Sequence, residues 1–262
     1  MSGGFEHGAA VRSQRWAKRG YSAGDRPGVS TGAGRMVRQT PSPNHDARPD
    51  GQPVDHLVLH YTGMQTAAAA LALLCDPDAP KTVSSHYVVE EDGLVHCLVP
   101  EERRAWHAGI SHWRGAEALN GRSIGIEIVN PGHEWGYREF PALQMAAVAE
   151  LCLGIVARHP IPARNVVAHS DIAPDRKQDP GELFDWQGLA GCGLGLWPTE
   201  APAVPDQPAL PLLQAIGYRT DLPLDVLLTA FQRHWRPAAV TGLADPETLA
   251  MLAAVARLAN RG

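Results

Sequence analysis

Short apolar runs alternate with longer helical patterns between residues 41 and 200. A run of about four to eight apolar residues between turn signals is typical of a strand, and apolar positions spaced by three and four are typical of a helix. Asp92-Gly93 between two such runs indicates a hairpin turn. The expected strands cover 56–60, 84–90, 94–99, 123–129 and 165–169, and the expected helices cover 66–74 and 140–159. Because strands and helices interleave, the pattern predicts an α/β fold.

The run 123–129 separates its side chains into two chemically different faces. Its three isoleucines share one side, because successive strand residues point to opposite faces. The other side carries Glu127, and a carboxylate within an apolar strand is costly to bury without a partner. Glu127 is therefore a candidate functional residue. The alternative is an ion pair with Arg104 or Arg122.

The C-terminal part follows a different pattern from the body. Residues 201–208 are rich in proline and predict a stiff linker. Two helical patterns follow at 224–235 and 246–260, the second with Asp245 placed as its N-cap. Residues 209–262 are few for an independent fold, so we expect a small all-α domain that rests on the body.

The first forty residues show no hydrophobic period. They are rich in Gly, Ser and Arg, which predicts a flexible basic leader over 1–40. Folded sequence is expected to begin near residue 41, so 41–200 forms the main domain.

Composition and charge narrow the function classes. The chain has 262 residues, 44% of them apolar and 19% charged, which is ordinary globular composition. Its formal net charge is −5, and the excess of positive charge is confined to the leader. This balance argues against a nucleic-acid partner held by phosphate contacts.

Cysteine usage and hydropathy indicate the compartment. None of the four cysteines forms a C-x-x-C pair, so a thiolate zinc site is not expected and reduced thiols fit best. The longest stretch without charge, 56–75, carries too many polar groups to span a membrane. No secretory apolar segment is visible in 1–40. We therefore expect a cytoplasmic protein with no membrane span.

Two of the twelve histidines stand out by position. His60 and His169 each end a short apolar run, where an α/β sheet exposes its functional edge. Asp179 follows ten residues after His169. Two imidazoles and one carboxylate with an open fourth position are the ligand set of a catalytic zinc site. The alternative is that Asp179 caps a turn and both histidines are hydrogen-bonded core residues. Spacing leaves both interpretations open.

Lys177 lies in the same loop, two residues before Asp179. A lysine there could stabilise a developing oxyanion. The alternative is a solvated loop cation.

Five motifs in order carry a resemblance to a known family. They are LHYT at 59–62, SHYVV at 85–89, AWHAG at 105–109, SIGIE at 123–127 and AHSDIAPDRKQDPG at 168–181. Together they resemble the zinc N-acetylmuramoyl-L-alanine amidases of the AmpD and AmiD type, whose fold is shared with peptidoglycan recognition proteins. The resemblance covers about residues 42–200. It implies a mixed central β-sheet flanked by helices.

The resemblance also implies roles for the candidate residues. It assigns His60, His169 and Asp179 as Zn²⁺ ligands, Glu127 as the catalytic carboxylate and Lys177 as the catalytic lysine. All five match, which implies a working enzyme. The implied reaction is hydrolysis of the amide between N-acetylmuramic acid, or its anhydro form, and L-alanine. Peptidoglycan fragments or muropeptides are then the partners, and cell-wall recycling is the expected context.

The C-terminal part has a weaker resemblance. The letters DV at 225–226, AFQ at 230–232, Gly242 and DPETL at 245–249 resemble a small three-helix peptidoglycan-binding module. We therefore expect 209–262 to be a peptidoglycan-binding-like domain. The alternative is a helical extension that only buries apolar surface of the body.

A sugar–peptide substrate needs a stacking surface and hydrogen-bonding groups. Four residues are expected to supply them: His86, Trp106, His107 and Asn120. The alternative is that Trp106 is core and His86 holds a neighbouring loop.

Other functions stay open beside recycling. They are an envelope amidase that acts on the wall, a muropeptide sensor that no longer cleaves, and a zinc peptidase that cuts within stem peptides. The common helix motif H-E-x-x-H of zinc peptidases is absent.

Overall fold

The computed structural model describes residues 37–199 and 207–261. Its centre is a six-stranded sheet with the order β1-β5-β4-β9-β3-β10. The strands are β1 (Val37–Gln39), β3 (His56–Tyr61), β4 (Tyr87–Val89), β5 (Val95–Cys97), β9 (Ser123–Ile128) and β10 (Val166–Ala168). β4 and β5 pair antiparallel as the hairpin around Asp92-Gly93, and the other neighbours pair parallel. The expected mixed sheet is confirmed.

Two small strand pairs and two short 3-10 helices support the loops around the sheet. β2 (His45–Ala47) pairs with β6 (Arg103–Ala105), and β7 (His112–Trp113) pairs with β8 (Ala116–Glu117). The 3-10 helices are η1 (Leu119–Gly121) and η2 (Ala163–Asn165).

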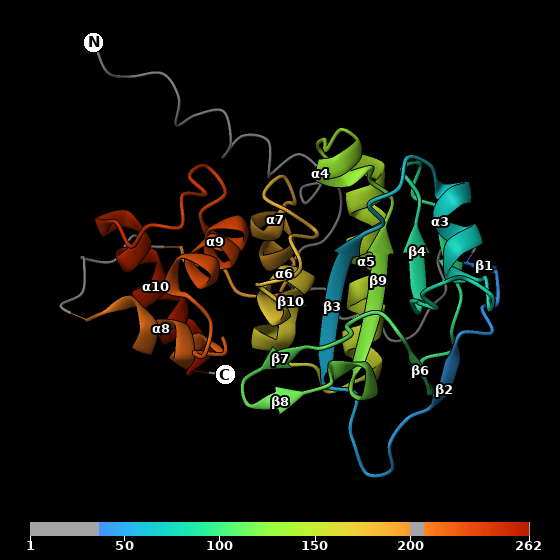
Figure 1. The fold of residues 1–262 in the computed structure, drawn as a ribbon, viewed down its shortest axis with the longest axis horizontal. Helices are drawn as coiled ribbons and strands as arrows, with labels where there is room; N and C mark the ends of the chain where they lie inside the picture. The colour runs from blue at the N-terminus through green and yellow to red at the C-terminus, as the bar shows by residue number, and fades with distance from the viewer. Residues whose placement is uncertain (1–36, 200–206, 262) are drawn as a thin grey trace.

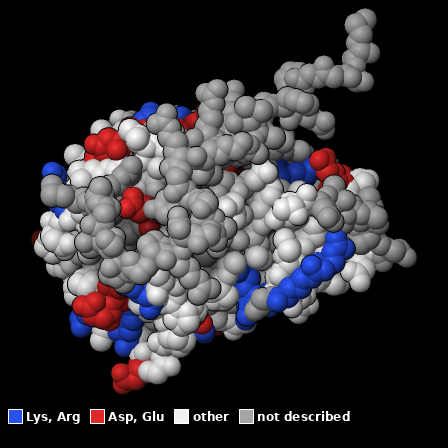
Figure 2. Space-filling model, turned by 180° about the vertical axis from the view of Figure 1, so that it is seen from behind, with Lys and Arg blue, Asp and Glu red and all other residues white. Residues whose placement is uncertain are grey.

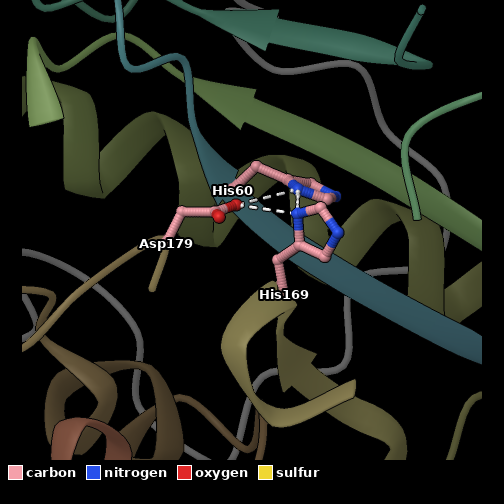
Figure 3. Close-up of side chains that lie close together, drawn as sticks. All are labelled: His60, His169 and Asp179. Atoms are coloured by element: carbon pink, nitrogen blue, oxygen red, sulfur yellow. Dashed lines mark hydrogen bonds and ion pairs between the residues drawn. The ribbon is translucent and has the colours of Figure 1, made fainter. Parts of the chain in front are cut away.

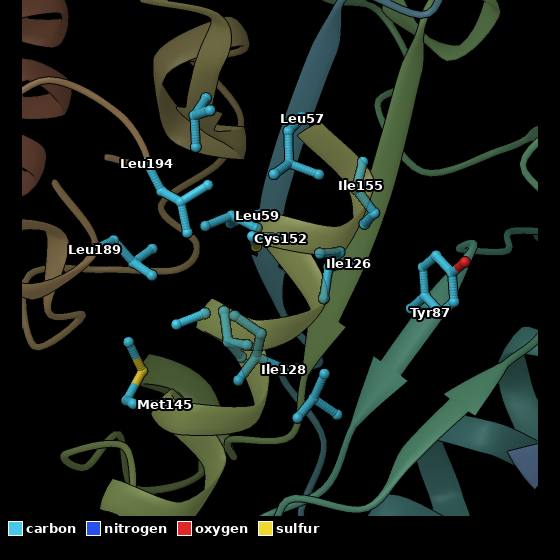
Figure 4. Packing of buried hydrophobic residues seen from close by; sticks show 14 of the residues in the cluster. Leu57, Leu59, Tyr87, Ile126, Ile128, Met145, Cys152, Ile155, Leu189 and Leu194 are labelled. Carbon is cyan, nitrogen blue, oxygen red and sulfur yellow. The ribbon is translucent and has the colours of Figure 1, made fainter. Parts of the chain in front are cut away.

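One face of the sheet is covered by the longest helix, α5 (Ala142–Arg158), with α7 (Trp186–Gly191) beside it. Leucines of β3 and the three isoleucines of β9 pack there against Met145, Cys152 and Ile155 (Figure 4). The two faces of β9 are thus divided as the alternation predicts. This apolar layer leaves the opposite face of β9 and β3 for polar side chains.

The opposite face is covered at its two sides. On the β4 side lies α3 (Ala67–Leu74), whose first turn is capped by the Thr66 hydroxyl accepting from the amide of Ala69. On the β10 side lie the short helix α6 (His169–Ile172) and the C-terminal helices (Figure 1). A further short helix, α4 (Gly132–Trp135), follows β9. The strip of sheet between these two sides is where the candidate site lies.

The C-terminal part forms α8 (Ala209–Ile216), α9 (Leu224–Trp235) and α10 (Pro246–Ala259). The Asp245 side chain caps α10 by accepting from the amide of Thr248, as predicted. Leucines of α8 and Phe231 of α9 belong to one buried cluster with Val58 and Val167 of the sheet. The C-terminal helices and the body therefore share a hydrophobic core.

Three expectations about the chain need correction or fall outside the described ranges. Val37–Gln39 lies within the expected leader but forms β1 at the sheet edge, so folded structure begins before residue 41. His169 does not end a strand, because it is the first residue of α6. The rest of the leader, and most of the linker 201–208, lie outside the described residues.

Charged side chains of both signs are interspersed over the visible part of the face seen from behind (Figure 2). Among the helices of 37–199 and 207–261, none has the length and hydropathy needed to cross a membrane.

Candidate metal centre and active site

Sheet register brings the two singled-out histidines together. β10 pairs parallel with β3 so that Ala168 lies opposite Leu59. The residue after Ala168 is His169, and the residue after Leu59 is His60. The two histidines therefore meet at the same edge of the sheet. Both are almost fully buried.

Asp179 reaches the same point from the loop that follows α6. One of its carboxylate oxygens, Oδ2, lies 3.0 Å from Nδ1 of His60 and 3.0 Å from Nδ1 of His169 (Figure 3). The two Nδ1 atoms are 2.9 Å apart. Three buried side chains thus direct one ligand atom each to a common centre. In the described parts of the chain, this is the one group of three or more such residues that could hold a metal ion.

The protonation of His60 follows from its hydrogen bonds. The Ser123 hydroxyl donates to the carbonyl of Leu119 at 2.6 Å, so its oxygen accepts from Nε2 of His107 at 3.1 Å. With its proton on Nε2, His107 accepts at Nδ1 from Nε2 of His60 at 3.0 Å. His60 therefore directs an unprotonated Nδ1 to the centre.

His169 presents the same tautomer for a different reason. Its Nε2 donates to the carbonyl of Ala108 at 3.3 Å, which leaves Nδ1 without a proton. Two ring lone pairs and the carboxylate of Asp179 then face one another, and such a set repels itself unless a cation lies between its members. These donors fit a divalent metal of the zinc type, because each ring is held by a contact at Nε2 and turns Nδ1 to the centre.

Burial and neighbouring charge act on the titrating groups of this centre. Burial lowers the pKa of His60 to about 4, and His169 adds to this lowering. The neutral imidazole that a metal requires is therefore the stable form at neutral pH. Burial also raises the pKa of Glu127 well above its usual value, and the charge of Asp179 adds to the rise.

Glu127 lies directly beside His60 in the pairing of β9 with β3. Its Oε2 atom is shielded from solvent and has no hydrogen-bond partner among the described residues. The alternative partners are engaged elsewhere: Arg122 pairs with Asp55, and Arg104 pairs with Asp46. An ion pair with either arginine therefore does not explain Glu127, and the carboxylate is available for chemistry at the centre.

A cavity of about 330 Å³ opens onto this centre. Glu127, His169 and Asp179 line it, and Lys177 contributes to the wall from the loop before Asp179. Trp106 also lines it and is partly exposed, so it is not a core residue. The cavity thus joins the candidate metal ligands to a carboxylate, a cation and an aromatic surface.

Two of the residues expected to bind substrate lie behind the cavity wall. His86 is fully buried, and its Nδ1 accepts from the amide of Gly125 while Nε2 donates to the carbonyl of Arg103. The Asn120 side chain accepts from the amides of His107 and Ala108. Both side chains hold backbone segments that position the histidine cluster. His107 itself lines the cavity and also contacts His60.

Sequence reasoning missed several residues of the site. Tyr61, Arg176 and Gln178 line the cavity, and each is adjacent in sequence to a residue that had been singled out. Gly125 makes room for the ring of His107, since a Cβ there would lie 2.4 Å from its Cγ atom. The glycine within an apolar strand was the available signal for this close approach.

Fold and site agree with a known family of hydrolases. The model of the N-acetylmuramoyl-L-alanine amidase family matches residues 50–182. The chain belongs to this family. It is 42% identical over 230 residues to the N-acetylmuramoyl-L-alanine amidase AmiD of Escherichia coli K12, which covers 76% of this chain and 81% of that protein. It is 37% identical over 165 residues to the 1,6-anhydro-N-acetylmuramyl-L-alanine amidase AmpD of Salmonella typhimurium SL1344, covering 57% of this chain and 86% of that protein.

Solved structures give the same assignment. One is AmiD from E. coli in complex with anhydro-N-acetylmuramic acid-L-Ala-D-γ-Glu-L-Lys, with a TM-score of 0.70 at 40% identity, covering 80% of this chain and 91% of that chain. Another is AmpDH3 from Pseudomonas aeruginosa, with a TM-score of 0.71 at 32% identity, covering 88% and 98%. Both matches cover more of this chain than the amidase domain alone.

Proposed function

We propose that this amidase binds a zinc ion through the Nδ1 atoms of His60 and His169 and a carboxylate oxygen of Asp179. The observation that carries the proposal is the convergence of two buried ring nitrogens and one carboxylate oxygen within 3.0 Å. Three protein ligands with an open position are typical of catalytic zinc. Bound zinc would supply a Lewis acid and lower the pKa of a coordinated water towards about 7.

The reaction is hydrolysis of the amide between the lactyl carboxyl of N-acetylmuramic acid and L-alanine. We assign Glu127 as the general base that takes a proton from the attacking water and returns it to the leaving nitrogen of L-alanine. The raised pKa makes the ionised carboxylate a stronger base than an exposed one. Lys177 faces the cavity, where its ammonium group is proposed to stabilise the oxygen that becomes negative.

The substrate proposed for this chain is an anhydro-muropeptide released during cell-wall recycling. The support is that AmiD was solved with an anhydro-muropeptide and that AmpD relatives are named for the anhydro sugar. Trp106 is proposed to contact the sugar–peptide directly, because it lines the cavity and is partly exposed. His107 is proposed to contact it from the deeper wall. For His86 and Asn120 the hydrogen bonds support an indirect role, through the loops they hold.

Mass spectrometry of the products tests this function. Purified protein and anhydro-muropeptide should give an intact peptide that begins with L-alanine, and a chelator should abolish its release. A shortened stem peptide would favour a peptidase, and no product from either anhydro-muropeptide or polymeric wall would favour a sensor. Cleavage of the polymer alone would keep the chemistry and favour an envelope enzyme.

Glu127→Gln is the matched variant for the proposed base. It keeps the size and shape of the side chain, so zinc binding should stay within about twofold of the unmodified protein. Turnover should fall by about 10²- to 10⁴-fold, the usual range for removing a general base. A Glu127→Gln protein with a near-normal rate would contradict this assignment.

The cytoplasm is the compartment we propose. The support is that Cys75, Cys97, Cys152 and Cys192 are all free thiols, which suits a reducing environment. Fractionation of the native host should find the protein with cytoplasmic markers, and recovery with the envelope would contradict the proposal.

A further inference from the structure

Asp171 is a buried carboxylate outside the proposed metal ligands and is 1% exposed. Oδ1 accepts from the hydroxyl of Tyr218 at 2.5 Å. Oδ2 accepts from Nδ1 of His234 at 2.6 Å and from the amide of Ala168 at 2.8 Å. Both oxygens of this carboxylate are therefore used, and two of the three donors come from the C-terminal part of the chain.

The third bond places Asp171 at the start of α6. By accepting from the amide of Ala168, its side chain closes the turn that leads from β10 into α6, whose first residue is His169. The next residue, Ser170, donates its amide to the carbonyl of Asp179 at 3.0 Å. The backbone of α6 thus fixes one proposed metal ligand directly and a second one through this bond.

The two donors from the C-terminal part are rigidly held. The ring of His234 is stacked between those of Trp186 and Trp235, with centroids 3.8 and 3.6 Å away. Tyr218 packs edge to face on Trp113, with centroids 5.1 Å apart. Because these rings are already immobilised, ordering the hydrogen bonds to Asp171 costs little additional conformational entropy.

A buried carboxylate that loses its donors does not stay where it was. Leaving a buried charged oxygen without a partner costs more than the net value of the bond itself. Without Tyr218 or His234, the carboxylate of Asp171 is expected to rotate towards water. The turn before His169 would then lose its closure.

We infer that Tyr218 and His234 are positioning residues for the metal centre, acting through Asp171 on the helix that carries His169. The C-terminal helices then support the site through Asp171, because all the residues that line the cavity lie between Tyr61 and Asp179. The inference rests on the proposed function, since it takes His169 and Asp179 as metal ligands.

The test compares two tyrosine variants of the full-length protein. Tyr218→Phe removes one phenol-to-carboxylate hydrogen bond and keeps the ring on Trp113. Tyr87→Phe is the matched control, because the Tyr87 hydroxyl donates to Glu101 at 2.7 Å in a part of the sheet without a contact to α6 among the described interactions. Affinity is measured by Zn²⁺ competition with a chelating dye, and geometry by the visible spectrum of the Co²⁺-loaded protein.

Tyr218→Phe should weaken Zn²⁺ binding about tenfold, the lower end of the range for losing a ligand's own hydrogen-bond partner, because Tyr218 acts one step further out. The Co²⁺ spectrum should change as well. Tyr87→Phe should change neither, although it lowers thermal stability. His234→Phe, which keeps the stacked ring and removes the donor, should behave like Tyr218→Phe.

Two outcomes would overturn the inference, and they differ. If the unmodified protein binds zinc and Tyr218→Phe matches Tyr87→Phe in affinity and spectrum, the network serves stability alone and the proposed function stands. If the unmodified protein binds neither metal, the metal assignment fails and the inference fails with it.

Discussion

At the scale of single residues, the tautomer of His60 is determined by groups that lie outside the candidate metal centre. The carbonyl of Leu119 orients the Ser123 hydroxyl, which fixes the proton of His107 on Nε2. Nδ1 of His107 then accepts a hydrogen bond from Nε2 of His60. Each hydrogen bond in this series determines which atom donates and which accepts in the next one. The nitrogen that His60 offers is therefore decided two side chains away.

Ser123→Ala tests this series of bonds. Without the hydroxyl, His107 can place its proton on Nδ1, and His60 must then carry its own proton on the atom that faces the centre. Zn²⁺ affinity should fall about tenfold. The control is Ser85→Ala, because the Ser85 hydroxyl is equally buried but donates to the carbonyl of Gly125. An affinity equal to that of the control would refute the proposed order of protons.

Residue chemistry was predictable only in part. The strand patterns singled out His60 and Glu127, whereas the strand expected to end at His169 stops at Ala168. The family motifs implied roles for all three residues. The indirect roles of His86 and Asn120 were not predictable, because their partners are backbone groups that folding brings near. A sequence shows which side chains can bond, but not which carbonyl or amide lies opposite them.

At the scale of secondary structure, Glu101 ties the segment between β5 and β6 to the end of α5. Its carboxylate accepts from Arg158 at 2.6 Å, Tyr87 at 2.7 Å and His159 at 2.7 Å. Burial alone would raise the pKa of Glu101, but these hydrogen bonds outweigh it and lower the pKa to about 2. Folding therefore stabilises the ionised carboxylate of Glu101 relative to its protonated form.

This lowered pKa predicts an acid-sensitive contribution to stability. A carboxyl whose folded pKa is depressed stabilises the fold above its unfolded pKa of 4.5 and loses this effect as pH falls to about 2. In metal-free protein at pH 7, Glu101→Gln should lower the free energy of unfolding by about 1 to 3 kcal/mol. In urea unfolding, the difference in free energy of unfolding between the unmodified protein and Glu101→Gln should become smaller as pH falls towards 2. Glu150 is exposed, and the control variant Glu150→Gln should show no such pH-dependent difference in the free energy of unfolding.

Elements with a strong local signal were predicted with nearly correct bounds, and weak ones were not. α9 follows clear apolar spacing, and α10 has the Asp245 cap as well. β1 has only three exposed residues, and its pairing with β5 joins segments far apart in the chain. α8 is eight residues long with Pro211 in its first turn, so it lacks the length that makes a helical period visible. Only the family resemblance implied a third helix.

At the scale of the whole molecule, the shared core predicts one unfolding transition. Phe231 and Leu213 of the C-terminal helices are fully buried in the same cluster as Val58 and Val167 of the sheet. Neither part can open without exposing the apolar surface of the other. Denaturant unfolding of metal-free protein should give one midpoint by tryptophan fluorescence and by circular dichroism. Two separate midpoints would show that residues 209–262 fold independently.

The division of the chain at residues 201–208 and glycan binding by 209–262 stay predictions. The structure is compatible with a domain that binds a ligand on its outer surface while its inner surface packs on the sheet. The alternative is that residues 209–262 only bury apolar surface of the body. The packing of their inner surface on the sheet agrees with that alternative, and glycan binding would need the outer surface.

The shared core also restricts how this enzyme can be rebuilt. One module of a protein can be exchanged for another without loss of the rest only where linkers alone join the modules. Here, replacing α8–α10 would remove the donors to Asp171 and uncover Val58 of β3 and Val167 of β10. A new targeting module therefore belongs beyond α10, as an addition to the chain and not as a substitute for its last three helices.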